Sequence, residues 1–226
     1  RPDGGGSARS LFLLPGAEAR RLTGIDEVLD LDQFESELEK RAGALGMLYI
    51  PFSPHETAAT SRDRALEHDS ARRKDPWDGR PSRESVFENS LKIRLGSSVQ
   101  IRNLAPAIDG LRRVKDAQEM KLLRIAGSIG ALGMKEAIRS AVPGMYEYQI
   151  AATAQYYFAW HGASGPAFHP IVGSGPNSCM PHYDRNRRRM AAGDIVVFDF
   201  GPDYNYYQAD ITRTFPVSGR FTEEQA

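Results

Sequence analysis

The sequence predicts a mixed α+β protein. Two amphipathic helical patterns cover most of residues 116–160, and two short strand patterns, Ile195–Phe198 and Ile211–Phe215, follow them. A smaller α/β unit precedes the helices. These three observations define the fold class.

The longer helix is expected to begin at a capping box. Asp116 is followed three residues later by Glu119, a pair whose side chains satisfy free backbone amides at a helix amino terminus. Apolar residues then recur at mainly helical intervals as far as Ile138, and Pro143-Gly144 ends the helix. A second helix is predicted over residues 147–160. Its buried stripe is expected to contain Ile150, Ala154, Tyr157 and Phe158.

The smaller unit is predicted from strands at Ser10–Leu14 and Ala44–Ile50, with a short helix between them around Phe34 and Leu38. Val86–Leu95 suggests a further helix. Val99–Ile101 suggests a further strand. No chemistry is visible in this part of the chain.

Composition divides the chain into two predicted domains. Residues 1–110 form a partial α/β domain, and residues 111–226 carry the stronger elements. Between about 53 and 85 the chain becomes rich in Arg, Asp, Ser, His and Pro, which favours a surface excursion or linker. We interpret His55 and His68 there as solvated residues rather than metal ligands.

Bulk properties exclude several classes of function. The 226 residues include 29 basic and 29 acidic side chains, so no net field favours nucleic acid or an anionic membrane. No apolar stretch is long enough for a membrane helix. The single Cys179 excludes an internal disulfide and fits a reducing compartment. We therefore expect a soluble, cytoplasmic protein.

The strand Ile195–Phe198 leads directly into a carboxylate. Its continuous apolar run predicts a strand buried on both faces, which would bring Asp199 into a buried environment. Burial of an unpaired ion costs several kcal/mol. Asp199 therefore requires a metal, a cation or a raised pKa.

A second carboxylate, Asp210, precedes the strand Ile211–Phe215. A chain reversal at Tyr204-Asn205 would place Asp199 directly opposite Asp210, with Cβ atoms about 4.5–5.5 Å apart. Two such carboxylates would repel each other if bare, yet could chelate two divalent ions about 3.5–4 Å apart.

An ordinary structural role is the alternative for both aspartates. Asp210 could pair with Arg213, and Asp199 could cap a turn beside Gly201. Spacing alone leaves this alternative open.

The loop upstream adds a histidine. His182 follows the glycine-rich segment 173–177, which lacks the Gly-Lys-Ser/Thr of a phosphate-binding loop. Alone, His182 is most simply an ordinary hydrogen-bonded residue, and Cys179 is most simply a packed thiol rather than a nucleophile. We interpret the arginines after His182 as a solvated hairpin tip. They are Arg185, Arg187, Arg188 and Arg189.

Taken together, four segments resemble the pita-bread metallopeptidases, specifically aminopeptidase P and prolidase. These segments are Ile171–Asn177, His182-Tyr183, Val197–Gly201 and Ala209–Pro216. The resemblance is clear from about Leu111 onward. It implies the amino-terminal half of a pita-bread fold, preceded by part of a small creatinase-like α/β domain.

The resemblance also implies a site and a reaction. The residues that match the family's ligands are Asp199 and Asp210, which would hold two divalent ions, Mn²⁺ first and Co²⁺ or Zn²⁺ as alternatives. A water bridging the ions is the implied nucleophile, and His182 would contact the substrate near the scissile carbonyl. The substrate would be a peptide with proline in second position. A homodimer is also implied.

The family completes its metal site with a histidine and two glutamates that have no counterparts among residues 183–226. We therefore expect this chain to carry part of an active site and to be inactive alone. The alternative is a catalytically inactive pita-bread module that binds peptide or protein.

Overall fold

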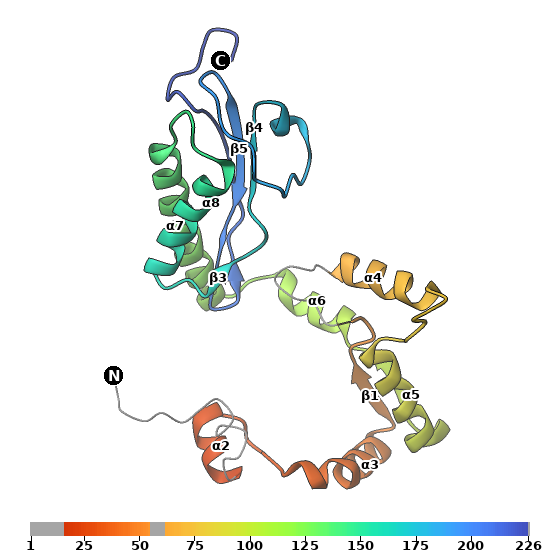
Figure 1. The fold of residues 1–226 in the computed structure, drawn as a ribbon. Coiled ribbons are helices and arrows are strands. Elements are labelled where there is room, and N and C mark those ends of the chain that lie inside the picture. Colours follow the sequence, from red (N-terminus) through yellow and green to blue (C-terminus); the bar gives the residue numbers. More distant parts are fainter. Residues whose placement is uncertain (1–15, 55–61, 226) are drawn as a thin grey trace. The chain divides into compact units, whose positions relative to one another are not determined.

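The computed structural model describes residues 16–54 and 62–225, and the strand predicted at Ser10–Leu14 lies outside these ranges. The described residues divide into two compact units. One contains residues up to 54 together with 75–106. The other contains the described part of 55–74 together with the chain from 107 onward (Figure 1).

The first unit is a small α/β arrangement around two parallel strands. Its helices and strands, with short 3-10 turns labelled η, are α2 (Gly16–Thr23), η1 (Leu31–Gln33), α3 (Phe34–Leu45), β1 (Met47–Ile50), α5 (Arg83–Leu95), η2 (Gly96–Ser98) and β2 (Gln100–Asn103). Met47 pairs with Gln100, and the register continues to Ile50 and Asn103. The core of this unit includes the buried residues Ala42, Leu91 and Val99.

Two differences from expectation occur between residues 44 and 85. The strand expected at Ala44–Ile50 begins only at Met47, because α3 continues to Leu45 and ends at Gly46 in the left-handed conformation (φ 66°). The polar stretch 53–85 contains helix α4 (Arg62–Lys74), which the sequence pattern does not predict. Arg72 and Arg73 donate to Asp69 from the next turn, which supports a helix with little apolar character.

The second unit carries the long helices and the larger sheets. Beyond α4 and α6 (Ala105–Arg113), its elements are α7 (Ala117–Ser140), α8 (Glu147–Trp160), β3 (Gly165–Pro166), β4 (Ile171–Ser174), η3 (Gly175–Cys179), β5 (Ile195–Phe200), β6 (Pro202–Tyr204), β7 (Tyr207–Gln208) and β8 (Ile211–Pro216). No helix within the described ranges is both long and apolar enough to cross a membrane.

Local signals account for both long helices. Asp116 accepts from the amides of Gln118 and Glu119, and its own amide donates to Glu119, so the predicted capping box is confirmed. Helix α8 has the predicted bounds. Ile150, Ala154 and Phe158 are buried in it as expected, whereas Tyr157, predicted in the same stripe, is only half-buried.

Close contact between α7 and α8 depends on a glycine. A Cβ atom at Gly133 would lie 2.4 Å from the ring of Phe158 and 3.0 Å from the carbonyl oxygen of Ala154. The absence of a side chain there lets the two helices lie side by side along the sheet (Figure 1). Their shared core includes buried residues from β4, β5 and β8.

Two antiparallel three-stranded sheets complete the unit, in the orders β4-β5-β8 and β3-β6-β7. The chain passes from β5 into β6 and returns through β7 into β8, so one long hairpin contributes to both sheets. The predicted strands at Ile195–Phe198 and Ile211–Phe215 are confirmed as parts of β5 and β8. The candidate site lies where this hairpin passes from one sheet to the other.

Candidate metal centre

Strand β5 presents Asp199 on the face opposite its most deeply buried residues. Val196, Phe198 and Phe200 are fully buried, whereas the alternate positions, including Val197 and Asp199, are half-buried. The prediction of a strand buried on both faces is therefore wrong. One face packs into the core shared with α7 and α8, and the face of Asp199 is covered only in part.

The residue directly opposite Asp199 on β8 is Thr212, not Asp210. The predicted register is thus wrong by two residues, because the chain reverses one position later than expected. The turn residues are Asn205 (φ 51°) and Tyr206 (φ 68°), and Tyr204 pairs with Tyr207 around them. Positive φ at both central positions is the geometry of the two-residue turn that fits the twist of a hairpin.

Asp210 lies where the hairpin changes from one sheet to the other. It follows Ala209 in the short gap between β7 and β8, across from Gly201 in the gap between β5 and β6. A Cβ atom at Gly201 would lie 1.7 Å from the Ala209 carbonyl oxygen. Only glycine permits this approach, so Gly201 allows the bend beside the two aspartates.

The two carboxyl groups interact despite the altered register. Burial raises the pKa of Asp199 above its ordinary value, while hydrogen bonding with Thr212 lowers it. The charge of Asp210 and a side-chain hydrogen bond with it raise the pKa further. Diagonal neighbours across a hairpin lie on one face of the sheet, which explains the interaction.

One carboxylate oxygen has the character expected of a metal ligand. Oδ1 of Asp199 is buried and, among the residues described, has no hydrogen-bond partner. A buried acceptor without a partner costs free energy that a bound cation would offset. The pair Asp199 and Asp210 therefore fits a divalent cation. No group of three or more potential metal-binding side chains occurs within the described ranges.

The structural alternative for the aspartates is not supported. Asp199 is within strand β5 rather than at a turn. Arg213 donates to the backbone oxygen of Thr212, and the described residues show no ion pair between Arg213 and Asp210.

His182 is near enough to Asp199 to act on it electrostatically. Its charge lowers the pKa of Asp199, opposing the effects of burial and of Asp210. The side chain is exposed, in the loop between η3 and β5, and its backbone has a left-handed φ of 51°. His182 thus lies in a loop within electrostatic range of Asp199.

Sequence reasoning missed a buried acidic residue beside this loop. Glu147 opens α8, is 0% exposed and accepts five hydrogen bonds. Burial alone would raise the pKa of Glu147, but the hydrogen bonds from Ser174, Asn177 and the Arg188 amide lower it below its ordinary value. An acidic residue in the first turn of a helix normally indicates only a favourable interaction with the helix dipole. The sequence pattern therefore gives no signal of its burial.

Two expectations about neighbouring residues are wrong. Arg188 is not part of a solvated hairpin tip: it forms an ion pair with Asp194 and donates to the hydroxyl of Ser174 (2.9 Å). Its partners, the buried Ser174 and the half-buried Asp194, are not identified by the local sequence. Cys179 is exposed rather than packed, because it ends the short turn η3.

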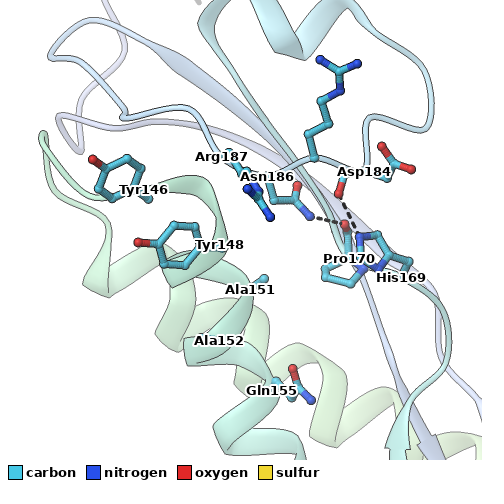
Figure 2. A pocket seen from close by; sticks show the side chains of 11 residues that line it. Tyr146, Tyr148, Ala151, Ala152, Gln155, His169, Pro170, Asp184, Asn186 and Arg187 are labelled. Atoms are coloured by element: carbon cyan, nitrogen blue, oxygen red, sulfur yellow. Dashed lines mark hydrogen bonds between the residues drawn. The ribbon is translucent and has the colours of Figure 1, made fainter.

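A separate hollow of about 560 Å³ lies beside the amino-terminal end of α8 (Figure 2). The stacked rings of Tyr146 and Tyr148 line one side. On the other side, His169 interacts with the backbone oxygen of Asp184 at 2.9 Å. None of the predicted site residues lines this hollow.

Comparison with known proteins finds similar sequences and structures. Residues 121–226 match Metallopeptidase family M24. The Xaa-Pro aminopeptidase of Escherichia coli is 42% identical over 120 residues, which are 53% of this chain and 27% of that protein. The Xaa-Pro aminopeptidase of Haemophilus influenzae is 37% identical over 126 residues, or 56% of this chain and 29% of that protein. These matches support the aminopeptidase P and prolidase branch of family M24 for residues 121–226.

Solved structures extend the M24 likeness beyond the sequence match. Proline aminopeptidase P II from Yersinia pestis superposes with a TM-score of 0.70 at 31% identity, covering 92% of this chain and 44% of that one. A putative aminopeptidase P from Bacillus anthracis gives 0.76 at 27% identity, covering 94% and 46%. The mixed α+β, partial pita-bread fold is thereby confirmed. The chain spans less than half the length of those solved relatives.

Proposed function

We propose that this chain carries part of the active site of a metal-dependent aminopeptidase that releases the amino-terminal residue from peptides with proline in second position. The relatives named Xaa-Pro aminopeptidase support the substrate class. The observation that carries the proposal is the buried, unpartnered Oδ1 of Asp199 beside Asp210. A buried carboxylate beside a second carboxylate is the combination expected at a site that binds a cation.

Asp199 and Asp210 are the proposed ligands of two divalent ions. Carboxylate oxygens suit Mn²⁺, with Co²⁺ and Zn²⁺ as the alternatives. A solved E. coli aminopeptidase P in complex with product is zinc-substituted. When bound, the ions would lower the pKa of a water and stabilise negative charge on the substrate.

His182 is the proposed catalytic residue of this chain. Its exposed position in a loop close to Asp199 would let it reach a peptide bound at the aspartates. From there the imidazole can donate a hydrogen bond near the scissile carbonyl or transfer a proton. His182 is thus proposed to contact the substrate and not to bind the metal.

The proposal includes three further elements. The remaining metal ligands come from outside the described residues. The protein acts on peptides in the cytoplasm, as a homodimer, with no role for nucleic acid or membrane. A non-catalytic module that binds peptide is the competing function, but such a module has no need of an unpartnered buried carboxylate beside a second one.

Metal content tests these assignments in the full-length protein. We expect Asp199→Ala and Asp210→Ala to lose bound Mn²⁺ after equilibrium dialysis, measured by mass spectrometry of the metal. His182→Ala should retain the metal and lose turnover of an Xaa-Pro peptide. Full Mn²⁺ content in both aspartate variants would refute the ligand assignment. Tight peptide binding by wild type without hydrolysis would favour the non-catalytic module.

A further inference from the structure

Glu147 is the most heavily hydrogen-bonded carboxylate in the described part of the second unit. Oε1 accepts from the Ser174 amide (2.9 Å), the Ser174 hydroxyl (2.7 Å) and the Asn177 amide group (3.0 Å). Oε2 accepts from the Tyr183 hydroxyl (2.8 Å) and the Arg188 amide (2.9 Å). All five partners donate, so the group is an ionised acceptor with no exposure to solvent.

The two carboxylate oxygens of Glu147 accept hydrogen bonds from different parts of the chain. Ser174 and Asn177 precede His182, whereas Tyr183 and Arg188 follow it. One carboxylate therefore joins both ends of the segment 177–183. This segment carries His182.

The same network reaches the strand that carries Asp199. Arg188 donates to Ser174 and forms an ion pair with Asp194, the residue immediately before β5. A second buried polar residue, Asn186, accepts from the Val172 amide (2.8 Å) and so ties the chain after His182 to β4. The loop is thus attached to the sheet at several points on both sides of His182.

The backbone at His182 needs such support. Its φ of 51° is in the left-handed region, which disfavours a residue with a Cβ atom by about 1–2 kcal/mol. A conformation of this kind persists when surrounding contacts hold it. The hydrogen bonds to Glu147 on both sides of His182 are contacts of this type.

Helix formation alone does not explain this arrangement. An exposed carboxylate at the start of α8 would interact with the helix dipole just as favourably, and would avoid the cost of burying a charge. We propose that Glu147 is a positioning residue, which holds the loop 177–183 so that His182 faces the metal pair at Asp199 and Asp210. This inference rests on the proposed peptidase function.

Tyr183→Phe tests the inference with a single-atom change. The variant removes one donor to Glu147 and keeps the aromatic ring, so the protein should fold. Tyr148→Phe on the same helix as Glu147 is the matched control, since Tyr148 is exposed and its hydroxyl is outside the network. In the full-length enzyme with Mn²⁺, we expect Tyr183→Phe to lower kcat for an Xaa-Pro-Xaa peptide about tenfold to a hundredfold. KM and metal content should stay near wild type.

A double-mutant cycle separates positioning from general damage. If Tyr183 acts through His182, Tyr183→Phe should have no further effect on kcat in a His182→Ala background. Equal kcat for Tyr183→Phe and Tyr148→Phe would overturn the inference, as would a full additive loss in the His182→Ala background. Absence of hydrolysis by wild type would instead refute the peptidase function, which keeps the two failures distinct.

Discussion

Asp199 and Asp210 are diagonal neighbours across a bent hairpin, and Thr212 is the residue directly opposite Asp199. The offset of two residues preserves the face of the sheet on which each side chain lies. Diagonal side chains are farther apart than opposed ones, yet the charge of Asp210 still raises the pKa of Asp199. Gly201 permits the bend at which Asp210 is placed.

Asp199→Asn should stabilise the metal-free protein. Burial and the neighbouring charge of Asp210 raise the pKa of Asp199, so its ionised form is unfavourable at neutral pH and a neutral amide relieves that cost. We expect a gain of about 1 kcal/mol in the free energy of unfolding. Denaturant unfolding with and without Mn²⁺ provides the measurement, and the variant should also lose the stabilisation that Mn²⁺ gives wild type.

The substitution Asp184→Asn, at an exposed residue, is the control for that experiment. It should change neither the free energy of unfolding nor the stabilisation by Mn²⁺. A metal-free Asp199→Asn protein less stable than wild type would contradict the view that this carboxylate is unfavourable without a cation.

Gly133→Ala should loosen the contact between α7 and α8. The added methyl group would lie 2.4 Å from the Phe158 ring and 3.0 Å from a backbone oxygen. Overpacking of this kind costs about 1–3 kcal/mol. Gly127→Ala in the same helix has open space around its Cβ position and should stabilise by up to about 1 kcal/mol. Thermal unfolding of both variants checks the difference, and equal effects would show that the helices do not depend on close contact at Gly133.

Glu147 should make a pH-dependent contribution to stability. Its pKa in the folded protein is lowered below the ordinary 4.5. The contribution is therefore fully present above about pH 4.5 and is lost as the pH falls through the folded pKa. Glu147→Gln leaves the Arg188 amide facing a group that cannot accept, and should cost about 3 kcal/mol or more at pH 7.

The measurement is the difference in unfolding free energy between wild type and Glu147→Gln from pH 7 to pH 3. This difference should begin to shrink below about pH 4.5, where the carboxyl group of the unfolded protein gains a proton, and it should reach its minimum below the lowered pKa of the folded protein. A difference that does not change with pH would mean that the charge of Glu147 is unimportant.

Local sequence signals predict most of the fold around the site. The capping box at Asp116 and the apolar spacing in α8 identify both helices, because these signals act within a few residues. Strand β5 and the carboxylate near its end are also visible as a pattern. The four motifs that resemble the M24 enzymes agree with the family model that matches residues 121–226.

The remaining features depend on contacts between distant parts of the chain. The hairpin register follows from the turn at Asn205-Tyr206, where neither residue is the glycine that usually indicates such geometry. The burial of Glu147 depends on donors 27–41 residues away in sequence. Periodicity reports only on near neighbours, so it predicts neither the register nor the network.

The most direct test is Mn²⁺-dependent release of the amino-terminal residue from an Xaa-Pro-Xaa peptide by the full-length protein, compared with its Asp210→Ala variant. The account predicts hydrolysis by wild type that requires Mn²⁺, and a loss of at least about a thousandfold in the variant, as for removal of a group essential to transition-state stabilisation. Substantial activity of Asp210→Ala with Mn²⁺ present would contradict the assignment of this aspartate to the metal site.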